Sequence, residues 1–108
     1  MPTSHGRAAV NPKLKDPLAD QLCQAVLTLK TVEECYRFFE DVCTIGEVKA
    51  MAQRLEIARL LYTGHTYDEV TQRTHASSAT TSRVRRFLEY GADGYRLVLA
   101  RLGAHPPR

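Results

Sequence analysis

Three copies of the pattern T-x-x-E stand at the starts of apolar segments in this chain of 108 residues. They are Thr31 with Glu34, Thr44 with Glu47, and Thr66 with Glu69. This spacing is the signature of a capping box, in which two side chains satisfy free backbone N–H groups at a helix N-terminus. Each box fixes a helix start independently, and the intervals between boxes leave only short connections. The pattern therefore predicts an all-α fold.

The apolar residues between these starts recur with the period of a helix. We expect a helix near residues 14–29, a second from Thr31 to about 43, and a third that ends at Gly64, a natural residue for the left-handed position after a helix. Two short helices follow within 66–90, and a last helix spans 92–102. No segment shows sustained period-2 alternation. We expect residues 14–102 to form a single six-helix domain, with a flexible arm at 1–13 and a flexible tail at 103–108.

The segment TYDEVTQRTHASSATTSRVRR at 66–86 has the pattern of a helix-turn-helix. Ser77 or Ser78 can cap the second helix. On a helical wheel Val84, Phe87 and Leu88 share one arc, with Thr80 and Thr81 beside it. The surface left for DNA comprises Ser77, Ser78, Ala79, Ser82, Arg83, Arg85 and Arg86. Small hydroxyls and guanidinium groups are suited to contacts in the DNA major groove, so the segment predicts a recognition helix. The alternative interpretation of the same pattern is an amphipathic surface helix with a basic outer face.

Charge is distributed unevenly along the chain, whose net charge is +3. Residues 31–69 carry four basic against eight acidic side chains, a net −4, and residues 77–108 carry six against two, a net +4. The positive potential therefore lies in the same half as the predicted recognition helix.

Cysteine and histidine give no sign of a metal site. The three cysteines, Cys23, Cys35 and Cys43, are odd in number and show no C-x-x-C spacing, and the sequence has no secretory signal. We therefore expect a cytoplasmic protein in which all three serve as small buried apolar residues. The four histidines form no H-x-x-x-H pair, which predicts no zinc site. No apolar run approaches the roughly 20 residues that cross a bilayer, so no membrane association is expected.

Wide apolar stripes over residues 14–62 predict a homodimer, because two successive helices with full apolar faces suit pairing with another chain. The first stripe contains Leu14, Leu18, Leu22, Val26 and Leu29. With eight aromatic residues and no Trp, a core made by one chain would be modest. The alternative is an ordinary six-helix monomer.

Three stretches, EECYRFFEDVCT at 33–44, AQRLEIARLL at 52–61 and SATTSRVRR at 78–86, resemble the tryptophan-repressor-like superfamily, specifically its YerC/YecD branch. The resemblance covers roughly residues 14–102. It implies an all-helical, intertwined homodimer from which two helix-turn-helix units project, the docking mode for which the tryptophan repressor serves as a standard example.

The resemblance also implies a candidate ligand pocket. Arg54, Arg83 and Thr44 match the two arginines and the threonine that hold tryptophan in the repressor, and Thr80 matches a threonine of its recognition helix. Phe87 replaces a serine that helps hold the ligand ammonium, so we expect free tryptophan not to be the effector. His75 stands where the turn usually has a left-handed Gly.

Two classes of function follow. The first is a sequence-specific, DNA-binding transcriptional regulator whose partners are double-stranded DNA and a second copy of the chain. The second is a dimeric protein-interaction module that uses its acidic middle and does not bind DNA. The clustering of arginines on the predicted recognition helix favours the first. No nucleophile–base or carboxylate pair has the spacing of a catalytic site, so we expect no enzyme and no cofactor.

Overall fold

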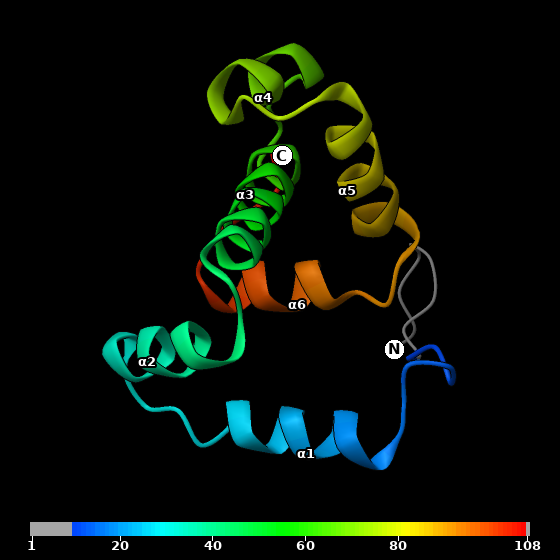
Figure 1. Cartoon of the computed structure of the whole chain (residues 1–108). Coiled ribbons are helices and arrows are strands. Elements are labelled where there is room, and N and C mark those ends of the chain that lie inside the picture. Colours follow the sequence, from blue (N-terminus) through cyan, green and yellow to red (C-terminus); the bar gives the residue numbers. More distant parts are fainter. Residues whose placement is uncertain (1–9, 108) are drawn as a thin grey trace. The chain divides into compact units, whose positions relative to one another are not determined.

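The computed structural model describes residues 10–107, which form six helices and no strand (Figure 1). The helices are α1 (Pro17–Val26), α2 (Val32–Val42), α3 (Ile45–Tyr62), α4 (Tyr67–Thr74), α5 (Ser78–Tyr90) and α6 (Gly94–Arg101). The predicted all-α, six-helix class is confirmed. α1 is shorter than expected because Asp16 caps it, its carboxylate accepting from the Ala19 N–H, and Pro17 occupies the first turn.

Two of the three predicted capping boxes are complete. At α4 the Glu69 N–H donates to Thr66 Oγ1 at 3.2 Å, and the Thr66 N–H donates to the Glu69 carboxylate at 2.8 Å. Thr44 and Glu47 exchange the same pair of bonds at α3. At α2 Thr31 accepts from the Glu34 N–H, but the Glu34 carboxylate turns to the N–H of Lys30. The third box is therefore only half formed.

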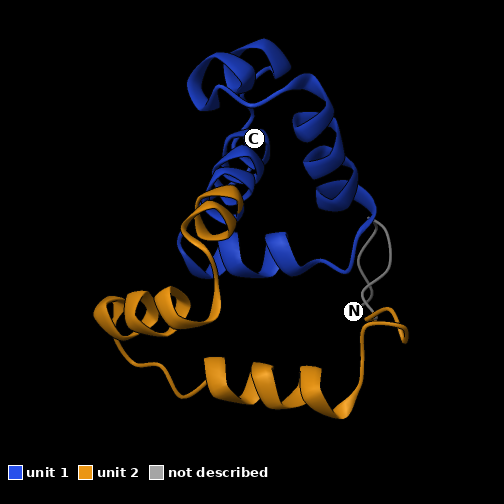
Figure 2. Ribbon diagram, in the orientation of Figure 1, with its two compact units in different colours: residues 1–9, 51–108 blue, residues 10–50 orange. Residues whose placement is uncertain are grey.

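Two compact units divide the described chain, residues 10–50 and residues 51–107 (Figure 2). The unit 51–107 has a core to which α3, α4, α5 and α6 all contribute. Its fully buried members are Ile57, Ala58, Leu60, Val70, Val84 and Leu99. Thr81 is also buried, and its hydroxyl donates to the Ser77 carbonyl at 3.1 Å, which satisfies the polar group without leaving the helix.

The unit 10–50 has no fully buried residue. Its large apolar side chains remain exposed along both α1 and α2. Leu18, Leu22 and Val26 lie on α1 and Val32, Tyr36 and Val42 on α2, and Leu14, which precedes α1, is exposed as well. Phe38 and Phe39 are half-buried and pack edge to face, with ring centroids 5.6 Å apart. The prediction that all three cysteines are buried is wrong, since Cys23 is exposed and Cys35 and Cys43 are half-buried.

The chain turns tightly at Gly64, where φ is 98°. A Cβ at this position would lie 2.9 Å from Pro107 Cγ, so Gly is required both by the backbone and by the neighbour. Ala104 packs against the core of the same unit. Ala104 and Pro107 thus lie against other residues of the unit 51–107, and the mobility of the tail stays a prediction. Residues 1–9 of the predicted arm lie outside the described chain.

Within residues 10–107, no helix is both long and apolar enough to span a membrane.

Candidate nucleic-acid interface

α4 and α5 form the predicted helix-turn-helix. Val70 of α4 and Val84 of α5 are buried in the shared core, and His75 ends α4 in a left-handed conformation with φ 57° and ψ 21°. His75 thus adopts the left-handed backbone conformation that a Gly usually adopts in the turn of a helix-turn-helix. Gln53 of α3 donates to the Thr74 carbonyl at 3.1 Å, which satisfies a backbone acceptor at the end of α4.

α5 is capped by Ser77, whose side chain accepts from the Thr80 N–H at 3.1 Å. One face of the helix contains the buried residues Thr81, Val84 and Leu88. The other face is exposed and contains Ser78, Ala79, Ser82, Arg83, Arg85 and Arg86. The two arcs expected from the helical wheel are therefore present, with the proposed DNA-contacting residues on the exposed one.

Phe87 departs from this pattern. It was expected on the buried arc, but 43% of the residue is exposed. It borders a shallow apolar hollow together with Leu55 and Val98. The guanidinium carbons of Arg83 and Arg86 lie 6.0 Å and 5.6 Å from the centroid of its ring. These distances are within the range of cation–π attraction, so the ring lies beside two of the exposed arginines.

Arg85 is held differently. Its Nε donates to the Glu89 carboxylate at 3.2 Å, one turn further along α5. An exposed pair of this kind contributes little to stability, but it limits the positions of the Arg85 side chain. The three arginines of α5 thus have two kinds of neighbour, an aromatic ring and a carboxylate.

Tyr67 contacts two residues of the candidate interface, although no sequence pattern indicated this. Its hydroxyl donates to the Ser78 carbonyl at 2.7 Å and is also hydrogen-bonded to the Ser82 hydroxyl. The first residue of α4 is therefore tied to the exposed face of α5. In the sequence Tyr67 is marked only by its position directly after Thr66, the cap of α4. That position does not predict hydrogen-bond partners 11 and 15 residues away.

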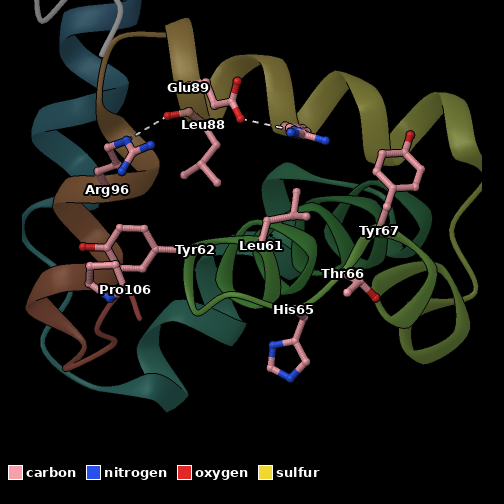
Figure 3. A pocket seen from close by; sticks show the side chains of 10 residues that line it. Leu61, Tyr62, His65, Thr66, Tyr67, Leu88, Glu89, Arg96 and Pro106 are labelled. Atoms are coloured by element: carbon pink, nitrogen blue, oxygen red, sulfur yellow. Dashed lines mark hydrogen bonds and ion pairs between the residues drawn. The ribbon is translucent and has the colours of Figure 1, made fainter. Parts of the chain in front are cut away.

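A polar pocket is lined by residues of α3, α4, α5 and α6, among them Tyr62, Tyr67, Arg85, Glu89 and Arg96, together with Thr66 (Figure 3). Arg96 Nε donates to the Leu88 carbonyl at 2.9 Å, and its guanidinium covers the Tyr62 ring. Glu89 pairs with Arg85 and Thr66 caps α4. These polar groups hold the ends of α4 and α5 in place.

A family model described as Trp repressor protein matches residues 18–103. The chain belongs to the Trp repressor family. It is also 52% identical over 90 residues to the uncharacterized protein YerC of Bacillus subtilis (strain 168), which covers 83% of this chain and 86% of that protein. Family membership supports DNA binding and transcription regulation in general terms.

Two solved structures share the fold. One is a proposed Trp repressor from Staphylococcus aureus, with a TM-score of 0.84, 42% identity, and coverage of 88% of this chain and 95% of that one. The other is a TrpR like protein from Eubacterium eligens ATCC 27750, with a TM-score of 0.84, 49% identity, and coverage of 90% and 100%. The resemblance inferred from the three sequence stretches is thus confirmed.

The residues of the candidate ligand pocket are divided between the two units. Thr44 belongs to the unit 10–50, and its hydroxyl caps α3. In the unit 51–107, Thr80 Oγ1 accepts from the Ser77 hydroxyl at 3.0 Å. Arg54 is half-buried, and the nearby Glu56 pairs with Arg59 at 2.7 Å. The pocket stays a prediction.

Across residues 10–107 no group of three or more His, Cys, Asp and Glu side chains is placed to hold a metal ion.

Proposed function

We propose that this chain is a sequence-specific DNA-binding transcriptional regulator that acts as a homodimer. The observation that carries the proposal is α5, which buries Thr81, Val84 and Leu88 and leaves its serines and arginines exposed. A helix held by its apolar face with hydroxyl and guanidinium groups outward is the arrangement that helix-turn-helix proteins insert in the major groove.

The dimer is supported by the unit 10–50. Its apolar side chains on α1 and α2 are exposed in the single chain. Soluble monomeric proteins rarely expose so many large apolar side chains on neighbouring helices. A second copy of the chain would cover them, and residues 14–102 would then act as one domain of an intertwined dimer. In that dimer two α5 helices would contact successive turns of double-stranded DNA.

The DNA-binding test uses fluorescence anisotropy with selected and random duplexes. The double variant Arg83→Ala, Arg86→Ala should bind at least tenfold more weakly to both, because it removes charges that displace counterions from phosphates. Ser82→Ala should have a smaller effect. The control is Arg101→Ala, which removes an exposed arginine from α6. Equal binding by the double variant and the wild type would show that α5 is not the recognition helix. A wild type that binds neither duplex would instead favour the protein-interaction module.

The effector of this regulator is not tryptophan in our proposal. Phe87 takes the position at which the repressor has a serine for the ligand ammonium, and its ring already lies beside Arg83 and Arg86. Isothermal calorimetry should detect no micromolar affinity for free tryptophan, and DNA affinity should not change when tryptophan is added. A micromolar constant accompanied by tighter DNA binding would overturn this part of the proposal.

A further inference from the structure

The Tyr67 hydroxyl has one hydrogen and two hydrogen-bond partners, Ser78 and Ser82. The Ser78 partner is a backbone carbonyl oxygen, 2.7 Å away, and a carbonyl can only accept. The single hydrogen of Tyr67 is therefore donated to Ser78. The bond to Ser82 must then be supplied by the Ser82 hydroxyl, whose hydrogen points to Tyr67.

We infer that Tyr67 makes Ser82 a hydrogen-bond acceptor toward DNA, so that Ser82 selects a base carrying an amino group. The serine oxygen retains lone pairs on the exposed face of α5 but has no hydrogen left to donate. This inference rests on the proposed function, since it assigns one residue of the DNA-binding surface its role.

The acceptor state excludes one kind of contact and selects another. Phosphate oxygens are acceptors, so Ser82 cannot bond to the backbone of DNA directly. In the major groove, the amino groups of adenine N6 and cytosine N4 are donors, whereas guanine and thymine present O6, N7 and O4 acceptors. Ser82 therefore reads adenine or cytosine at the base that it faces.

Ser78 differs from Ser82, although it lies one turn away on the same helix. Ser78 gives Tyr67 its backbone carbonyl, and that bond does not use its hydroxyl. Its side chain can therefore rotate to donate to a phosphate or to accept from a base. Two serines of one face thus have different chemistry, and the difference originates in α4.

The first test is a selection of bound duplexes by the wild type and by Tyr67→Phe. The wild type should enrich adenine or cytosine at one position of each half-site. In Tyr67→Phe the Ser82 hydroxyl is free to donate, so affinity for a guanine or thymine at that position should rise several-fold relative to the wild type. Ser82→Ala should lose the preference without this gain. Tyr90→Phe is the matched control, since that tyrosine of α5 is 66% exposed.

A second test needs no variant with altered folding. In the selected duplex, the chosen base is replaced by the purine or pyrimidinone analogue that lacks only the amino group. The wild type should bind this duplex about two- to tenfold more weakly, the usual range for one hydrogen bond. Ser82→Ala should bind both duplexes equally, which separates the lost contact from any weakening of the base pair.

Three results would overturn the inference. A wild type that binds DNA but prefers guanine or thymine at this position contradicts the acceptor state. A Tyr67→Phe variant with a thermal midpoint and a base preference equal to the wild type contradicts the role of Tyr67. A wild type that binds no duplex in the selection overturns the proposed function itself, which the first two results do not.

Discussion

The two units of this chain differ in how completely they bury their apolar side chains. The unit 51–107 buries Ile57, Leu60 and Leu99 completely, whereas in the unit 10–50 no residue is fully buried and Leu18 is 77% exposed. Both units contain helices with side-chain N-terminal caps, α1 and α2 in the unit 10–50 and α4 and α5 in the unit 51–107. Secondary structure therefore does not decide which unit completes its own core. The number of helices that converge on one point does, since four contribute to the core of 51–107.

The difference has a functional meaning under the proposed dimer. The unit that carries the recognition helix is fixed by its own core, so α5 has a defined face to offer to DNA. The unit 10–50 keeps its apolar side chains for a partner chain, and burial there would come with assembly. The predictions below test this division, from the largest expected effect to the smallest.

Phe39→Asp should have the largest effect. Phe39 is half-buried in the unit 10–50 and packs on Phe38. An Asp at this position would be buried without a partner on dimerisation, at a cost of several kcal/mol, so dimer and fold should be lost together. Light scattering and circular dichroism measure the two quantities. Gln24→Asp, which places the same charge at an exposed position of α1, is the control. A well-folded monomer at micromolar concentration, for the variant or the wild type, would show that the unit 10–50 does not need a partner chain to fold.

Leu60→Ala tests the self-contained core. Leu60 is 1% exposed, so its truncation should lower the free energy of unfolding by about 2–5 kcal/mol. The matched change in the other unit is Leu18→Ala, which should act through dimer dissociation. Denaturant unfolding measures the first effect, and sedimentation of dilute protein measures the second. Leu18→Ala with an unchanged dimer constant would remove α1 from the proposed interface.

Phe87→Leu examines the exception, an aromatic ring in the unit 51–107 that is not buried. Leucine keeps apolar volume but loses the π face beside Arg83 and Arg86. At exposed sites such contacts contribute about 0.5–1 kcal/mol, so DNA affinity should fall about two- to fivefold. Phe87→Tyr retains the face and should bind as the wild type does. Equal anisotropy titrations for Phe87→Leu and the wild type would mean that the ring does not position these arginines.

Local signals predicted most of this fold. The T-x-x-E pairs and Gly64 predicted the starts of α2, α3 and α4 and the end of α3, because caps and turns depend on residues only a few positions apart. The bounds of α1 and α6, which have no such pair, were predicted less closely. The buried face of α5 was also predictable from its period. The exposure of Phe87 was not, since a wheel places a side chain on an arc but does not show whether a neighbouring helix covers it.

The candidate site was predicted less completely than the fold. The exposed serines and arginines of α5 were identified from composition and helical position. Tyr67 was missed because its bonds to Ser78 and Ser82 join two helices across the turn. Such a contact depends on the angle between α4 and α5, which no residue in the intervening turn specifies by type alone.

The smallest effect concerns the cap at the start of α4, in the self-contained unit. The N–H of Thr66 donates to Glu69, which holds the pKa of that carboxyl below its ordinary value. A lowered pKa means that the carboxylate stabilises the folded state above the unfolded pKa and that this contribution is lost as pH falls through the folded pKa. Glu69→Gln still places a side-chain oxygen at the cap but does not titrate. The difference in thermal midpoint between the wild type and Glu69→Gln should therefore be constant near neutral pH and shrink below about pH 4.5.

Glu47→Gln, which alters the equivalent box of α3, should behave in the same way because the Thr44 N–H lowers the pKa of Glu47 by the same means. A difference that stays constant down to pH 2 would show that neither carboxylate is stabilised by its cap.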